Sequence, residues 1–286
     1  MPVTTTIAAL EDRSERRKYG WVSPDLARVL ARVEAQGGTE WMARYLRLVT
    51  LVLIVRTSTQ PPALVLPPSI DARRLLEFER ILDEGATRPL PTDIHDDRFR
   101  KDLELCRGGL VPTGHTVLES WPRLPEDVAD ACARNDPPFD AVVRASSAPW
   151  LEGHLFQPRM DEFTPDGIAA TSQRTVDLLE ANPEYAGIFG VSWYYDPAVS
   201  AISPRLEGVR QIAEHRSVEL VRIGPDPAAV AEAIATSKTR RKLYEQGLYE
   251  PTNYAVITRR ENVVREEIDS TVRDAFDDKP LAPDAT

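Results

Sequence analysis

Hydrophobic residues recur every three to four positions through most of the first 110 residues, which predicts amphipathic helices. In 23–38, Ser23 is a possible helix cap, Pro24 takes the first helical position, and apolar residues fall at 26, 29, 30 and 33. The stretches 69–85 and 92–109 have the same spacing and predict two more helices. In 39–55 the spacing is also helical, but β-branched residues at its end leave helix and strand both open.

After residue 109 short apolar runs alternate with helical segments. Strands are predicted at 110–120, 139–146, 185–195, 217–224 and 252–260, and helices at 164–183, 226–247 and 261–276. The stretch 196–215 predicts one helix or two short ones, because Pro204 interrupts it. This alternation predicts an α/β (α+β) fold, with a helical N-terminal third packed on a mixed sheet that helices cover. We expect a disordered N-terminus (1–20), a helical region (21–110), an α/β region (111–275) and a disordered tail (276–286).

Composition narrows the class of protein. The 286 residues include 45 acidic and 35 basic ones, a net charge of −10, which argues against general nucleic-acid binding. Two cysteines cannot form a disulfide framework or a four-thiolate metal site. The most apolar run, 48–55, is far shorter than the roughly 20 residues that span a bilayer, and the first residues do not resemble a secretory signal. A soluble cytoplasmic protein without membrane contact is expected.

An aromatic cluster ends the predicted central strand. Trp193, Tyr194 and Tyr195 come directly before Asp196-Pro197, and ligands of open α/β sheets bind beyond the carboxyl ends of strands. The aromatic residues either line a pocket or belong to the core, and Asp196 either contributes to a site or caps the next helix. Glycines within this strand, at 187 and 190, permit another backbone or a ligand to approach closely.

A second cluster is basic. Lys238, Arg240, Arg241 and Lys242 gather positive charge in an otherwise acidic chain. They are either a solvated helix end that complements the helix dipole or phosphate contacts for a nucleotide-like ligand such as coenzyme A.

The order of elements and the ending Leu243-Tyr244…Gly247-Leu248-Tyr249 resemble the C-terminal half of the GNAT (Gcn5-related) N-acetyltransferase fold over roughly residues 185–260. The resemblance implies an acyl-CoA co-substrate. It assigns the general acid that reprotonates the thiolate to Tyr244. It also implies donor contacts along the strand at Ser192, Trp193 and Tyr194, with phosphates near Arg240, Arg241 and Lys242. The segments SWYYDP, ISPRL and TRRKLYEQGLYEPTNY also resemble a group of uncharacterised bacterial proteins.

His154 is the candidate general base. It lies in a proline-bounded segment with Glu152, Arg159 and Asp161 nearby. The histidine either acts as a base that a carboxylate orients, or has a structural role. A metal site around His154 and Asp161 stays an alternative, although the spacing matches no common metal motif and no metal is expected. Asp196 is a second candidate base.

Short motifs of several other enzyme classes are missing from the sequence: Gly-x-Gly-x-x-Gly, the phosphate-loop motif, His-Glu-x-x-His and Gly-x-Ser-x-Gly. We therefore expect an acyltransferase that moves an acyl group from a coenzyme A thioester to a small amine or hydroxylamine. Two alternatives remain open: an aminoacyl transferase that uses charged tRNA, and a non-catalytic protein that binds a ligand or partner. The sequence predicts no oligomeric state.

Overall fold

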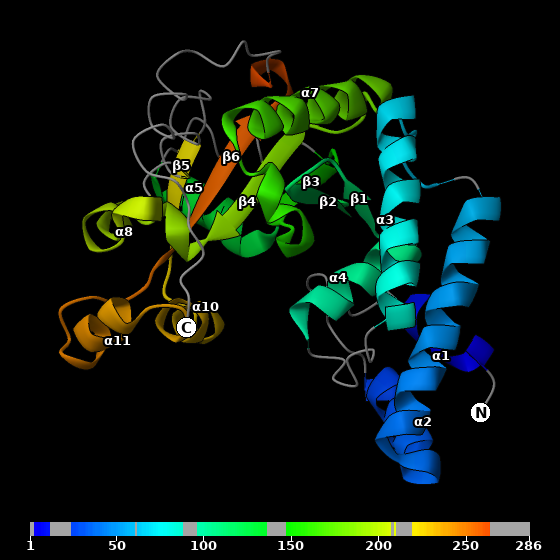
Figure 1. Ribbon diagram of the computed structural model, residues 1–286. Helices are drawn as coiled ribbons and strands as arrows, with labels where there is room; N and C mark the ends of the chain where they lie inside the picture. The colour runs from blue at the N-terminus through cyan, green and yellow to red at the C-terminus, as the bar shows by residue number, and fades with distance from the viewer. Residues whose placement is uncertain are drawn as a thin grey trace. The chain divides into compact units, whose positions relative to one another are not determined.

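The computed structural model describes residues 3–11, 24–60, 62–87, 96–135, 147–206, 209 and 219–263 (Figure 1). The chain divides into two compact units. Unit 1 comprises Met1–Glu119 and Leu155–Asp161, and unit 2 comprises Ser120–His154 and Glu162–Thr286. Helices and a mixed six-stranded sheet of order β1-β2-β3-β4-β6-β5 confirm the predicted α/β class.

Helices make up most of the described part of unit 1: α1 (Val3–Glu11), α2 (Pro24–Thr59), α3 (Pro68–Thr87) and α4 (Asp97–Cys106). The ambiguous stretch 39–55 is helical and continues α2 beyond a kink at Gly38, whose φ is 69°. A residue without Cβ adopts this left-handed φ at little cost, so the chain changes direction there. Asp96 caps α4 by accepting the Phe99 N–H at 2.7 Å.

Unit 1 has an apolar core of its own. The buried side of α2 packs with residues of α1, α3 and α4 and with the strand β1 (Leu110–Pro112). β1 pairs antiparallel with β2 (Thr116–Trp121), and Leu110 lies opposite Glu119. Among the largest fully buried side chains of this core are those of Leu46, Leu53, Leu105, Leu110 and Phe156.

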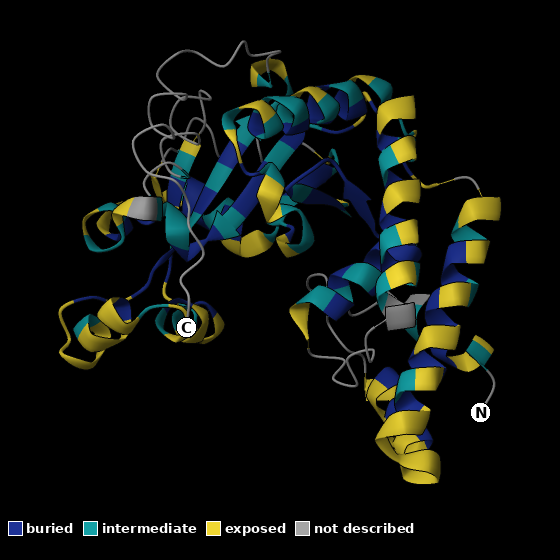
Figure 2. Ribbon diagram, viewed as in Figure 1, coloured by how far each residue is buried: buried dark blue, intermediate teal, exposed yellow. Residues whose placement is uncertain are grey.

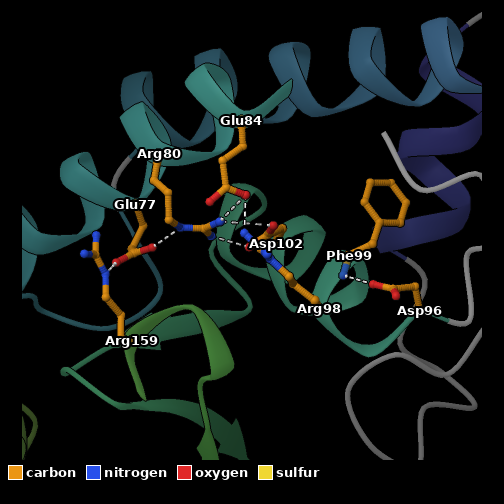
Figure 3. Close-up of polar contacts among 8 residues, drawn as sticks. All are labelled: Glu77, Arg80, Glu84, Asp96, Arg98, Phe99, Asp102 and Arg159. Atoms are coloured by element: carbon orange, nitrogen blue, oxygen red, sulfur yellow. Dashed lines mark hydrogen bonds and ion pairs between the residues drawn. The ribbon is translucent and has the colours of Figure 1, made fainter. Parts of the chain in front are cut away.

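Buried charges join α3, α4 and the 3₁₀ turn η1 (Gln157–Glu162), as Figure 3 shows. Glu77 is fully buried and accepts from Arg80 Nε at 2.7 Å and from Arg159 Nε at 2.6 Å. Arg80 also pairs with Asp102 and, at 3.3 Å, with Glu84. Because breaking a buried ion pair leaves an uncompensated charge, these contacts oppose the separation of α3, α4 and η1.

Unit 2 contains most of the sheet. β3 (Trp150–Leu155) and β4 (Gly187–Ser192) are parallel, while β4, β6 (Asn253–Arg259) and β5 (Glu219–Gly224) pair antiparallel. Its other described elements are α5 (Glu126–Asn135), α7 (Pro165–Ala181), η2 (Trp193–Tyr195), α8 (Pro197–Ile202), η3 (Pro204–Leu206), α10 (Pro227–Ala235), α11 (Lys238–Glu245) and η4 (Arg260–Asn262).

α7 follows its sequence signals closely. Thr164 caps it by accepting the Gly167 N–H at 3.2 Å, and Pro165 opens its first turn. The helix connects the two parallel strands, as such a crossover requires. A core cluster of unit 2 brings Trp150, Phe189, Val221 and Ile257 of the sheet together with Cys132 of α5.

Several sequence predictions need correction. The helix expected at 226–247 is two helices, because Thr236 ends α10 and Ser237 caps α11 by accepting the Arg240 N–H. The central strand ends at Ser192, and the aromatic residues after it form the 3₁₀ turn η2. β3 and α5 had no sequence prediction. The predicted strand 139–146 and the predicted helix from residue 264 onward lie outside the described residues.

Across the described parts of the chain, no helix combines the length and apolar character that a membrane span needs.

Candidate functional site

The two parallel strands define the candidate site. β3 and β4 run in the same direction and are linked through α7, so their carboxyl ends lie at the same edge of the sheet. Their ladder pairs Leu151 with Ile188 and Glu152 with Phe189, in the first half of each strand. Ligands of α/β proteins bind at this kind of edge, where His154 and Ser192 also lie.

The glycines of β4 permit close approach of the protein's own atoms. A Cβ at Gly187 would lie 2.2 Å from the Thr258 carbonyl oxygen. A Cβ at Gly190 would lie 3.4 Å from the carbonyl oxygen of Gly153 in β3 and 3.6 Å from the Tyr195 hydroxyl. Gly190 therefore lies where β3, β4 and the ring of Tyr195 come together.

Glu152 and His154 share one face of β3, because they are two residues apart on a strand. Glu152 Oε2 lies 3.7 Å from His154 Nε2, and each side chain is 12% exposed. A carboxylate at this distance can orient the imidazole ring. The pair has the composition of a general base and its orienting acid.

Asp196 is a helix cap that burial has made a weaker acid. Its Oδ1 accepts the Ala198 N–H at 3.0 Å and so caps α8. Burial raises the pKa of this carboxyl, while hydrogen bonds from the Ala198 and Thr252 backbone and the charge of Arg222 lower it. Both sequence interpretations of Asp196 thus remain compatible with its position.

Each aromatic ring of η2 contacts the ring of the next residue. The ring centroids of Trp193 and Tyr194 are 5.6 Å apart and those of Tyr194 and Tyr195 are 4.9 Å apart, both edge to face. Ser192 Oγ accepts the Tyr194 N–H at 3.5 Å. Trp193 is buried, whereas Tyr194 and Tyr195 are half-buried, so this turn contributes both to the core and to the surface.

Arg240 is buried, whereas its basic neighbours on α11 are exposed. Its Cζ lies 4.6 Å from the Trp193 ring centroid, and it donates to Ala233 O, Thr236 Oγ1 and Ser203 Oγ at 2.7–2.8 Å. Arg241, by contrast, is exposed, as is Lys242. A phosphate at Arg240 would compete with three protein acceptors, whereas the other two side chains face solvent.

The sequence did not identify Tyr249 as a candidate site residue. Its hydroxyl is buried and has no hydrogen-bond partner among the described residues. Burial and the nearby charge of Asp196 together raise the pKa of Tyr249 to about 12, although the charge of Arg240 lowers it. In the sequence, this tyrosine was noted only as the last residue of the Leu-Tyr…Gly-Leu-Tyr ending. Tyr244, to which the resemblance assigns the general acid, is 39% exposed on α11.

The structure brings together one part of the predicted site. Trp193 and Tyr249 share a small apolar cluster with residues of α8 and α10. Arg240 stacks on this tryptophan, and Asp196 acts electrostatically on Tyr249. His154 and Glu152 form a second group on β3. Asp161, the other residue of the metal alternative, belongs to unit 1, whereas His154 belongs to unit 2.

Comparisons with known proteins give a single structural likeness to report. No family model and no curated protein matches the chain. The chain resembles the crystal structure of a mutant of the acyltransferase orf11* in complex with octanoyl-CoA, with a TM-score of 0.50. Sequence identity is 13%, and the match covers 89% of this chain and 76% of that chain. At this identity the likeness establishes a shared fold.

Proposed function

We propose that this chain is an acyltransferase that takes its acyl group from a coenzyme A thioester and passes it to a small amine or hydroxylamine. The observation that carries the proposal is the likeness, over 89% of the chain, to an acyltransferase fold that binds octanoyl-CoA. The parallel pair β3 and β4, whose ladder covers only the first half of each strand, supports it. The donor would bind at the carboxyl ends of these strands.

We assign the donor contacts to residues at the end of β4 and on α11. The pantetheine arm would lie along the end of β4, at Ser192, Trp193 and Tyr194. Arg241 and Lys242 would meet the phosphates, because both are exposed cations on α11. Arg240, which the sequence placed with them, would act through Trp193, whose ring it covers.

The transfer step requires a base and an acid. His154, oriented by Glu152, would take a proton from the acceptor nitrogen as that nitrogen attacks the thioester carbonyl carbon. The new carbon–nitrogen bond forms as the carbon–sulfur bond breaks, and the coenzyme A thiolate takes a proton from Tyr244. Asp196 is the second candidate base, since burial raises the pKa of its carboxyl.

Calorimetric titration tests the proposal directly. We expect octanoyl-CoA, acetyl-CoA and free coenzyme A to bind the chain, and at about 100 times the dissociation constant each should add about 2.7 kcal/mol to its stability. Replacing Arg241 and Lys242 together by alanine should weaken binding about tenfold or more, because charge-assisted phosphate contacts are lost.

The matched control replaces Arg28 and Arg32, two exposed arginines of α2, by alanine. This variant loses the same charge and should bind as the wild type does. A protein that binds none of the three ligands, while circular dichroism shows it folded, would sink the acyl-CoA proposal. Equal weakening in both variants would instead mean that the phosphates do not contact α11.

One observation favours an aminoacyl-tRNA donor as the second candidate. Lys238, Arg241 and Lys242 are all exposed on the short helix α11, which would suit a polyanion as well as a coenzyme A phosphate. The two donors differ in the number of phosphates in contact with the protein. Their salt dependence therefore separates them.

A further inference from the structure

The second part of α2, residues 39–59, is apolar on both sides. One side carries Met42, Leu46, Val49 and Leu53 into the core of unit 1. The opposite side exposes Trp41, Leu48, Leu51 and Val55 by 49%, 47%, 38% and 62%. These positions follow one another at intervals of seven, three and four residues, the spacing of a helix–helix seam. Large apolar side chains that recur along an exposed side of a helix commonly mark a surface that another helix covers.

The neighbouring helix α3 also has two exposed apolar residues. α2 and α3 lie side by side and run in opposite directions (Figure 1), and Arg74 of α3 donates to the Thr57 carbonyl oxygen at 3.3 Å. α3 buries Ile70, Phe78 and Ile81. Its outer side exposes Leu75 and Leu76, by 47% and 52%, and Figure 2 shows exposed positions recurring along both helices.

The exposed charges of the two helices are opposite. On α2, Arg44 and Arg47 are exposed beside the apolar seam, and 39–59 contains three arginines against the single acid Glu40. On α3, Glu79 and Asp83 are exposed one and two turns beyond Leu76. A surface that carries both signs on adjacent helices is complementary to a copy of itself after a two-fold rotation.

We propose that two copies of this chain associate through α2 and α3, with the two-fold axis parallel to the helices. Each α2 then lies antiparallel to the partner's α3, as in a four-helix bundle. The exposed leucines of α2 and α3 from the two copies meet in the middle of the interface, and Arg47 comes within reach of the partner's Glu79. An arrangement of α2 against the partner's α2 would instead oppose the arginines.

The area available is sufficient for such an interface. Two helices of about 20 residues, each about 30 Å long and about 10 Å wide, offer roughly 600 Å² per copy. The total of roughly 1,200 Å² is above the ~1,000 Å² that a specific interface needs. This inference does not depend on the acyl-transfer proposal, because it concerns unit 1 and requires no ligand.

Sedimentation velocity on the full chain tests it. From about 1 to about 100 µM, we expect the wild type to sediment increasingly as a species of twice its 32.0 kDa. Arg47→Glu and Glu79→Arg should each raise the dimer dissociation constant at least about tenfold, because each places like charges opposite one another. The double variant exchanges the two charges and should restore association to within about threefold of the wild type.

Two controls keep the test specific. Arg32→Glu makes the same change of charge on an exposed part of α2 before the kink and should leave association unchanged. Leu48→Gln should weaken it without adding a charge, and circular dichroism checks that each variant folds. A wild type that stays monomeric throughout overturns the proposal. A dimer that is insensitive to Arg47→Glu, Glu79→Arg and Leu48→Gln also overturns it. So does a monomer in which the exposed apolar side of α2 binds an acidic helical peptide or anionic vesicles.

Discussion

At the scale of single residues, Arg240 contributes to stability more than its charge alone suggests. Its guanidinium covers the Trp193 ring and caps the end of α10 through Ala233 O and Thr236 Oγ1. We expect Arg240→Met to lower the free energy of unfolding by about 2 to 4 kcal/mol, because three hydrogen bonds and a cation–π contact are lost. Urea unfolding followed by tryptophan fluorescence measures this.

The adjacent residue supplies the control for that experiment. Arg241→Met removes the same charge from an exposed side chain and should change stability by no more than about 0.5 kcal/mol. If both variants are equally destabilised, charge rather than the buried contacts of Arg240 is responsible.

The Tyr249 hydroxyl gives a second prediction at this scale. It is buried without a partner among the described residues, so Tyr249→Phe removes an unsatisfied polar group. We expect the variant to be as stable as the wild type or up to about 1 kcal/mol more stable. The measurement is a thermal melt beside Tyr244→Phe, which alters an exposed residue. A clear loss of stability in Tyr249→Phe would mean that its hydroxyl has a partner in solution.

At the scale of elements, β4 depends on its two glycines to different degrees. We expect Gly187→Ala to destabilise the protein by about 3 kcal/mol or more, because its Cβ would lie 2.2 Å from the Thr258 carbonyl oxygen and push β6 away. Gly190→Ala meets its nearest atom at 3.4 Å and should lower stability by about 1 kcal/mol or less. Similar melting temperatures for the two variants would show that the sheet yields at Gly187.

Local signals predicted those elements whose ends are encoded beside them. Thr164-Pro165 begins α7, and the kink at Gly38 separates the two periodic stretches that the sequence shows in α2. The break between α10 and α11 was missed because the guanidinium that stabilises it, that of Arg240, follows the break and stacks on a distant tryptophan. β3 was missed for a related reason, since a strand with Glu152, Gly153 and His154 shows little apolar alternation.

The sequence singled out several residues of the candidate site, but it did not predict which of them contact one another. The sequence singled out Trp193, Asp196 and Arg240 and assigned the arginine to the phosphates of a ligand. In the structure, Arg240 donates hydrogen bonds to protein acceptors instead, at Ala233 and Ser203. Tyr249 could not be distinguished from a core aromatic residue, because the missing partner of its hydroxyl is a property of the packed structure alone.

At the scale of the whole molecule, the two units depend on contacts that no local pattern encodes. Residues 155–161 return to unit 1 from the middle of the α/β region. Arg159 in that segment pairs with Glu77, which is 82 positions away in the sequence. Periodicity within a window of some 18 residues cannot report such a contact, so the return of residues 155–161 to unit 1 could not be predicted from local patterns.

The charge of the whole molecule separates the two proposed donors. The net charge of −10 repels any polyanion, so tRNA could bind only through many local phosphate contacts, whereas coenzyme A needs few. Between about 50 and 200 mM salt, a complex with 6 to 10 phosphate contacts weakens by roughly 10³- to 10⁵-fold. We expect acyl-CoA affinity to fall less than about tenfold over this range, because only Arg241 and Lys242 would meet its phosphates.

Titrations of octanoyl-CoA and of an aminoacylated tRNA at both salt concentrations make the comparison, and uncharged tRNA serves as the control for nonspecific binding. An acyl-CoA affinity that changes little, with tRNA binding weak and equal for the charged and uncharged forms, supports the coenzyme A donor. Tight binding of the charged tRNA alone, with a steep loss in salt, would assign α11 to the tRNA and exclude the coenzyme A phosphates from it. The net negative charge makes this contrast sharp, since a polyanion is attracted only where exposed cations gather locally, as on α11.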